Sequence, residues 1–126
     1  MALATGLYRY APKTHELHLV AAMDVRRVTG YQDFVDTAPL DLVYVADHGR
    51  MKTIPAARRE SYASMAAGAM VQNVYLYCAS AGLATVVRAW FDKNALGQSM
   101  GLDADQQILL TQTVGLPAAA DSASHA

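Results

Sequence analysis

The sequence predicts an α+β fold, because helical and strand-like segments follow one another along the chain without regular alternation. Three observations lead to this prediction: an alternating segment around a proline-containing turn, short runs rich in β-branched residues, and one long run with helical spacing. The length of 126 residues suits one domain. We expect that domain to span residues 1–117. A disordered tail over 118–126 should follow, since this end is small, polar and without periodicity.

Four segments have the patterning of strands. Residues 6–10 and 16–20 alternate on either side of a turn that contains Pro12, which predicts a β-hairpin. Residues 40–46, LDLVYVA, form a β-rich run that suits a buried strand. Residues 107–114 are also strand-like and end at a Gly-Leu-Pro sequence.

The helical segments are defined mainly by their capping residues. Residues 24–29 begin with an aspartate and precede a glycine, which predicts a short helical turn. The longest helix should start within residues 54–60 and end at Ala81, with Gly82 as a left-handed cap. A second helix should occupy residues 92–101, between a capping aspartate and a glycine. Its inward-facing pair should be Leu96 and Met100.

The composition suggests a subunit that covers apolar surface with a partner. Hydrophobic residues make up 53% of the chain and charged residues only 17%, against about 25% in an average chain. The net charge of −1 gives no reason to expect nucleic acid or an anionic membrane as a partner. The longest apolar run is interrupted by Gln72 and Asn73, so we expect no membrane span. One cysteine and no secretory signal favour the cytoplasm.

Residue chemistry alone supplies no catalytic constellation. His15 and His18 are three residues apart and would point to opposite faces of a strand, so we expect no metal site there. Asp47 and His48 follow a predicted strand and are either an acid/base pair or a solvated turn. Cys78 lies within the long helix, where inert packing is the simpler interpretation.

Taken in order, several segments resemble the nitroreductase family of flavin-dependent oxidoreductases, and most closely its thiazoline/oxazoline-dehydrogenase branch. The resemblance covers nearly all of residues 6–117 and depends on the joint order and spacing of its motifs. These motifs are GLYRYAP (6–12), TAPLDLVYVAD (37–47), QNVYL (72–76), AGLATV (81–86) and TVGLP (113–117).

The resemblance implies a mixed, mostly antiparallel sheet flanked by helices in an intertwined homodimer, with FMN bound at two sites between the subunits. A helix enclosed by its own sheet and by a second copy would be apolar all round. Gln72 and Asn73 could then form hydrogen bonds inside the dimer core, although bonds to neighbouring backbone in a monomer core are the alternative.

By the same resemblance, the loop after the long helix lies against the flavin. Small residues and backbone N–H groups there would suit the flat ring and its polar edge. The chain departs from the family at positions 87, 89 and 90, which are often proline or glycine. Arg88 would either donate to a reduced flavin or face solvent. The positions that match the family's flavin-side segment are Leu83, Ala84, Thr85, Val87, Arg88 and Ala89.

The family's N-terminal helices, with an Arg/Ser-rich phosphate-binding segment, have no counterpart in this chain, so the domain is expected to be a truncated one. No Lys or Arg follows Pro117 to replace them. The resemblance therefore implies an FMN-dependent oxidoreductase that passes hydride from NAD(P)H to a nitro, quinone, enone or azoline-type acceptor, with a separate chain supplying the missing half. The alternative is a non-catalytic dimeric scaffold or partner subunit, and a binding module for another flat ligand is a third hypothesis.

Overall fold

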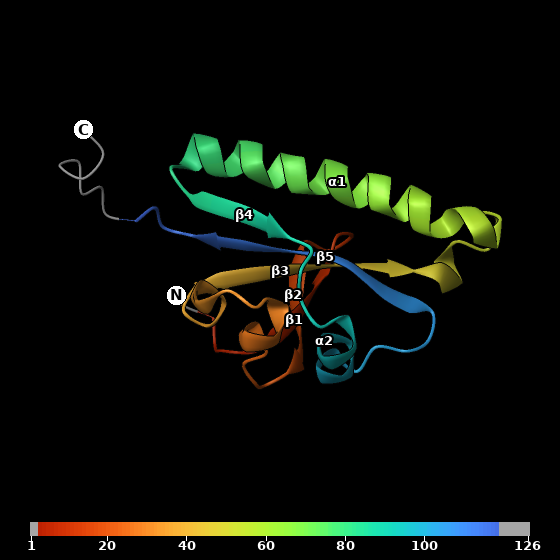
Figure 1. Cartoon of the computed structure of the whole chain (residues 1–126), viewed down its shortest axis with the longest axis horizontal. Coiled ribbons are helices and arrows are strands. Elements are labelled where there is room, and N and C mark those ends of the chain that lie inside the picture. Colours follow the sequence, from red (N-terminus) through yellow and green to blue (C-terminus); the bar gives the residue numbers. More distant parts are fainter. Residues whose placement is uncertain (1–2, 119–126) are drawn as a thin grey trace.

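The computed structural model describes residues 3–118, which form one sheet-and-helix body with a hairpin beside it (Figure 1). The hairpin pairs strand β1 (Leu7–Ala11) with β2 (Glu16–Ala21) in antiparallel register. Both strands lie within one residue of the predicted bounds. Apart from its first residue, the predicted tail over 118–126 lies outside the described residues.

The central sheet has three strands in the order β3–β5–β4, and both pairings are antiparallel. Strand β3 (Leu40–Asp47) and strand β5 (Gln106–Gly115) confirm the strands predicted at residues 40–46 and 107–114. Strand β4 (Ala84–Arg88) corrects the prediction of a loop after the long helix, because this segment pairs along its whole length with β5. Its β-branched centre, Thr-Val-Val, suits that pleated surface.

Helix α1 (Ala56–Ala81) crosses one face of the sheet (Figure 1). The predicted start and end are confirmed, and Gly82 ends the helix with a left-handed φ of 71°. The inner side of α1 buries Ala67 and Val71 against Tyr44 of β3. The Tyr44 hydroxyl donates to the buried side chain of Gln112 over 2.6 Å, so this core contains one satisfied polar pair.

The other face of the sheet is covered by shorter elements. Helix α2 (Lys93–Met100) starts at its capping aspartate and ends at a left-handed glycine, as predicted. Leu96 is fully buried with Phe91 and Ile108, and Met100 packs against this cluster. Two 3-10 turns, η1 (Arg26–Thr29) and η2 (Asp33–Asp36), lie on this side, and a third, η3 (His48–Arg50), follows β3. No helix within the described residues combines the length and hydropathy needed to cross a membrane.

Candidate functional site

An apolar cleft of about 520 Å³ opens at one end of the sheet, on the face away from α1. Its walls come from the start of β4, the end of β5, turn η2 and the segment 37–39 that connects η2 to β3. Ligand pockets in proteins typically enclose about 300–1,000 Å³, so the cleft is large enough for one flat ring system. The residues that line it include Phe34, Pro39, Ala84, Thr85, Val86 and Thr113.

The segment that the family resemblance assigns to the flavin contributes directly to this cleft. Ala84 and Thr85 line it, and the Thr85 hydroxyl donates to the carbonyl of Thr113 over 2.8 Å. Leu83 lies between α1 and β4, where its N–H donates to the Cys78 carbonyl. Ala89 is exposed just after the strand. Strand β4 is an edge strand, and no strand lies beside its outer edge within residues 3–118.

The two remaining positions of the segment have partners inside the chain. The backbone N–H of Val87 donates to the Tyr75 hydroxyl of α1 over 2.9 Å. Arg88 is only 4% exposed, so the expectation that it faces solvent is wrong. Its guanidinium forms an ion pair with Asp41 of β3, with Nη2 and Oδ1 3.0 Å apart. Burial lowers the pKa of Arg88, and the charge of Asp41 opposes that shift.

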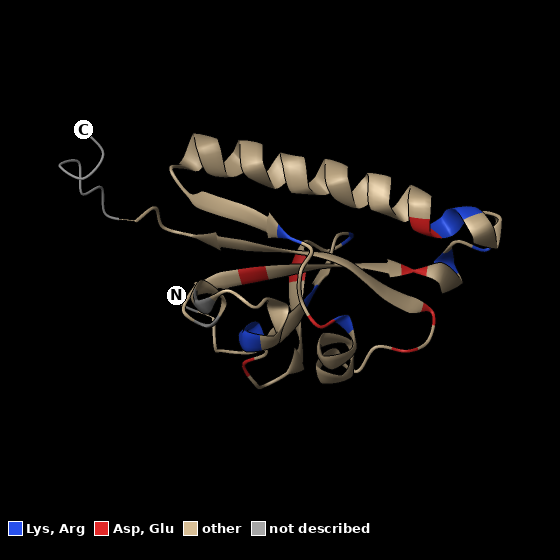
Figure 2. Cartoon of the chain, viewed as in Figure 1, with Lys and Arg blue, Asp and Glu red and all other residues tan. Residues whose placement is uncertain are grey.

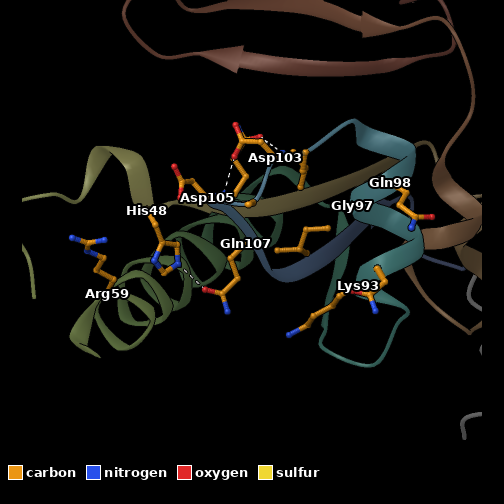
Figure 3. A pocket seen from close by; sticks show the side chains of 13 residues that line it. His48, Arg59, Lys93, Gly97, Gln98, Asp103, Asp105 and Gln107 are labelled. Atoms are coloured by element: carbon orange, nitrogen blue, oxygen red, sulfur yellow. Dashed lines mark hydrogen bonds between the residues drawn. The ribbon is translucent and has the colours of Figure 1, made fainter. Parts of the chain in front are cut away.

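A second, polar pocket of about 730 Å³ lies at the opposite end of the sheet (Figure 3). The His48 ring N–H at Nε2 donates to Gln107 Oε1 over 2.8 Å, at the centre of this pocket. Its charged walls are Arg59, Lys93, Asp103 and Asp105. Arg59 and Lys93 stand on opposite sides of Gln107, so they do not converge on one point where an anion could bind.

The residues considered for acid/base or metal chemistry are separated by the fold. Asp47 Oδ1 accepts from the backbone N–H of Gly49, whereas the side chain of His48 turns to Gln107, so they form no pair. His15 Nδ1 bonds the Tyr10 hydroxyl. Within the described residues, no three His, Cys, Asp or Glu side chains gather as metal ligands would. Cys78 is buried inside α1, as the packing interpretation predicted.

The outer side of α1 exposes several large apolar side chains. The charged residues of this helix, Arg58, Arg59 and Glu60, all stand near its start, and residues 61–81 carry no charge (Figure 2). Gln72 and Asn73 are exposed, which contradicts the interpretation that they bond backbone within a monomer core. In the single chain the helix is covered on one side only. The large exposed side chains of this outer face are Tyr62, Met65, Met70, Leu76 and Tyr77.

An antiparallel sheet with a long helix on one face and shorter elements on the other defines an α+β domain. The model of the nitroreductase family matches residues 4–116, and the chain belongs to that family. A protein of Methanocaldococcus jannaschii with a provisional nitroreductase name is 33% identical over 92 residues. That match covers 69% of this chain and 46% of the relative.

Solved structures have the same fold. The crystal structure of a provisional nitroreductase from Ralstonia eutropha JMP134 matches with a TM-score of 0.85 and 54% identity, over 91% of this chain and 55% of that one. The Escherichia coli microcin synthetase McbBCD complex, with truncated pro-MccB17 bound, matches with a TM-score of 0.76 and 25% identity. That match covers 94% of this chain and 47% of the other. A structure from Anabaena variabilis matches with a TM-score of 0.82, over 92% of this chain and 25% of that one. Its sequence identity is 23%, so this likeness indicates the fold alone. The chain therefore spans about half the length, or less, of these relatives.

The buried pair of Asp41 and Arg88 was not predicted from the sequence, in which the two residues are 47 positions apart. A signal was nevertheless present. Asp41 is the only charged residue within the apolar run 40–46, and Arg88 is the only one in the mostly apolar run 84–88. A single opposite charge in each of two apolar runs indicates pairing, because an unpaired buried charge is strongly unfavourable.

Proposed function

We propose that the chain is the flavin-ring-binding part of a nitroreductase-type oxidoreductase that uses FMN. One observation carries the proposal: a family match over residues 4–116 coincides with an apolar cleft whose wall includes Ala84 and Thr85, two positions of the expected flavin-side segment. Leu83, Val87, Arg88 and Ala89 complete that segment in the proposal. Arg88 then contributes through the backbone that it anchors, since its guanidinium is bonded to Asp41.

The cleft residues fit the ring of FMN better than its phosphate. The walls are mainly apolar and of the right size for an isoalloxazine, and the outer edge of β4 offers backbone groups to its polar rim. A phosphate is usually held by several charge-assisted hydrogen bonds. Among the described residues that line the cleft there is no Lys or Arg. The proposal therefore assigns the phosphate contacts to a different chain.

When bound, FMN supplies hydride transfer between NAD(P)H and an acceptor of the nitro, quinone, enone or azoline type. The part of this chain is to bind and orient the ring. The apolar walls exclude water from one side of it, and the hydrogen bond between Thr85 and Thr113 holds β4 against β5 beneath it. A reducing, cytoplasmic compartment belongs to the proposal and agrees with the single cysteine, Cys78.

A second copy of this chain is the proposed occupant of the outer face of α1. Twenty-one consecutive uncharged residues, 61–81, include five large apolar side chains that are more than two-fifths exposed. Complete burial of an exposed large apolar side chain contributes about 1.5–3 kcal/mol, and these side chains, which are already partly covered, would each contribute a part of that. Gln72 and Asn73 on this face would pair across the dimer, where buried amides need partners.

A titration with FMN and with riboflavin tests this proposal, because riboflavin carries the same ring without the phosphate. We expect both ligands to change the flavin absorption spectrum on binding, with dissociation constants within about tenfold of each other. Absence of any spectral change with either ligand would contradict the ring site. FMN binding that is a thousandfold tighter than riboflavin binding would contradict the assignment of the phosphate contacts to another chain.

A non-catalytic scaffold or partner subunit is the second candidate, and the absence of Lys and Arg from the described cleft lining favours it. The two candidates differ in turnover. An oxidoreductase oxidises NADH or NADPH in the presence of FMN and a quinone, whereas a scaffold does not. Turnover that appears only after addition of a separate chain that completes the domain would support the partner-subunit form.

A further inference from the structure

The face of the sheet away from α1 contains a buried charged network. The Asp41 and Arg88 side chains are 2% and 3% exposed, and their ion pair spans β3 and β4. Arg88 Nε donates to the Thr113 hydroxyl over 3.1 Å, and that hydroxyl donates to Asp41 Oδ1 over 2.6 Å. Arg88 also donates to the carbonyl and the hydroxyl of Thr29 in η1. The network therefore ties all three strands to a turn far away in the sequence.

Stability alone is a weak explanation for this network. Burial raises the pKa of the Asp41 carboxyl, while the Thr113 hydroxyl and the Arg88 charge act in the opposite direction. Asp41 Oδ2 is buried without a hydrogen-bond partner among the described residues. Replacing a buried ion pair by uncharged groups is often neutral for stability, so a pair of this kind is better explained by the geometry that it enforces.

The geometry that the network enforces is that of two exposed aromatic side chains, Tyr31 and Trp90. Trp90 follows Arg88 by two positions, and Tyr31 follows Thr29 by two positions. Their ring centroids are 4.6 Å apart at an interplanar angle of 50°. Trp90 is 69% exposed and Tyr31 49%, so the two rings contact each other while about half or more of each side chain remains exposed. The network thus joins Arg88 to Thr29, two residues before Trp90 and two residues before Tyr31.

Gly30 shows how closely the two segments approach. A Cβ atom at this position would lie 1.8 Å from Arg88 Nη1. The φ of Gly30 is extended, so the requirement is for space rather than for a special backbone conformation. Arg88 also lies over the ring of Phe34, with its Cζ 5.7 Å from the centroid, and Phe34 lines the apolar cleft. The network therefore contacts the cleft wall, through Phe34 and Thr113, and lies two residues before each member of the aromatic pair.

We propose that the Asp41–Arg88 pair is a positioning clamp, which fixes the Ala89–Trp90 backbone and the Tyr31–Trp90 contact and, through its contacts with Thr113 and Phe34 in the cleft wall, sets the affinity of the cleft for a flavin ring. Both residues are positioning residues, since neither reaches the cleft surface. The part of the inference that concerns the ring rests on the proposed function. The part that concerns Trp90 does not.

The test compares the wild-type chain with a double variant, Asp41→Asn with Arg88→Gln, which removes both charges and keeps polar groups. Trp90 is the only tryptophan of the chain, so its fluorescence reports this position alone. Arg50→Gln is the matched control, because Arg50 forms an ion pair with Asp47 at the surface and is 82% exposed. Each protein is measured for Trp90 emission, quenching by acrylamide, thermal unfolding, and binding of FMN and riboflavin.

We expect the double variant to unfold cooperatively but to show shifted Trp90 emission, stronger quenching and about tenfold weaker binding of both flavins. The control should match the wild type in all four measurements. Unchanged emission and quenching in a folded double variant would overturn the clamp. Shifted emission with unchanged flavin affinity would overturn its role in ring binding.

The clamp can still be tested if the double variant does not fold or if the wild type binds no flavin. If the double variant does not fold, Gly30→Ala is the substitute, because its Cβ would lie 1.8 Å from Arg88 Nη1 and would force the guanidinium to move. Unchanged Trp90 emission in this variant would overturn the clamp. If the wild type binds neither flavin, the proposed function fails, and the Trp90 measurements still decide whether the clamp exists.

Discussion

The outer face of α1 and the opposite face of the sheet distribute residue types in opposite ways. Helix residues 61–81 expose methionine, leucine and tyrosine side chains to solvent and carry no charge. On the opposite face of the sheet, Asp41 and Arg88 are almost completely buried. Each arrangement departs from the usual one, in which apolar groups are inside and charges are outside.

The buried charges and the exposed apolar side chains are compensated in different ways. The two charges are paired with each other and bonded by Thr29 and Thr113, although Asp41 Oδ2 has no hydrogen-bond partner among the described residues. The apolar surface of α1 has no cover within residues 3–118, and a surface of this kind usually marks an interaction site. We therefore assign the first region to fixed internal geometry and the second to association with another copy.

The largest expected effect comes from leaving one buried charge without its partner. Arg88→Gln should lower the free energy of unfolding by about 3–5 kcal/mol at neutral pH, because the Asp41 carboxylate then stays buried alone. Urea denaturation measures this value. Burial already raises the pKa of Asp41, so the folded state of the variant binds the proton more readily than the unfolded state does, and stability should recover as the pH falls.

The double variant Asp41→Asn with Arg88→Gln is the control for that prediction. It should be distinctly more stable than Arg88→Gln alone, since no uncompensated charge remains. Equal stability of the single and double variants would contradict the description of the region as a coupled ion pair.

The next effect concerns the other region. Met65→Lys with Leu76→Lys should abolish self-association at micromolar concentration, because two charges would have to be buried in the interface. Central interface residues commonly contribute about 2 kcal/mol or more each. Sedimentation equilibrium gives the change in association constant. Ala57→Lys, an exposed position in the charged first turn of the helix, should leave association unchanged.

A smaller effect is expected at the contact between η1 and the network. Gly30→Ala places a Cβ against Arg88 Nη1 and near Val35, so the guanidinium must shift. We expect a loss of about 1–3 kcal/mol, typical of overpacking, together with a shift of Trp90 emission. Thermal unfolding and fluorescence measure these two quantities. Wild-type stability and emission in this variant would show that the guanidinium is not held in place.

The smallest effect is a pH dependence at the surface. The side-chain and backbone hydrogen bonds from Arg26 lower the pKa of Asp24 to about 2. A lowered pKa stabilises the folded state above the unfolded value of 3.8, and that contribution is lost as the pH falls toward 2. The pair is exposed, so Asp24→Asn should remove only about 0.2–1 kcal/mol of acid-dependent stability. Denaturation at pH 5 and pH 2 tests this, with Glu60→Gln as the control.

Most of the fold could be predicted from local rules. Helix ends were readable at Gly82 and Asp92, because a left-handed cap and a capping carboxylate act on their immediate neighbours. Strand β4 was not predicted, since the five residues 84–88 become a strand only by pairing with β5, more than twenty positions away. Pairing between distant segments is not encoded in a five-residue pattern.

The candidate site was predictable only in part. The family resemblance located the segment around Ala84 and Thr85, which line the apolar cleft. It gave no indication that the guanidinium of Arg88 turns away from solvent toward Asp41, because the partner is 47 positions distant and on another strand. Contacts of this kind depend on strand order and register, which follow from the assembled sheet.

Above all, we propose that two copies of the chain associate through α1 and bind flavin rings. Sedimentation velocity of the chain mixed with FMN, recorded at the visible absorption band of the flavin, tests this proposal. We expect flavin absorbance that sediments with a species of twice the 13.5 kDa chain mass. Absorbance that stays with the free ligand, or that sediments with a single chain, would contradict it.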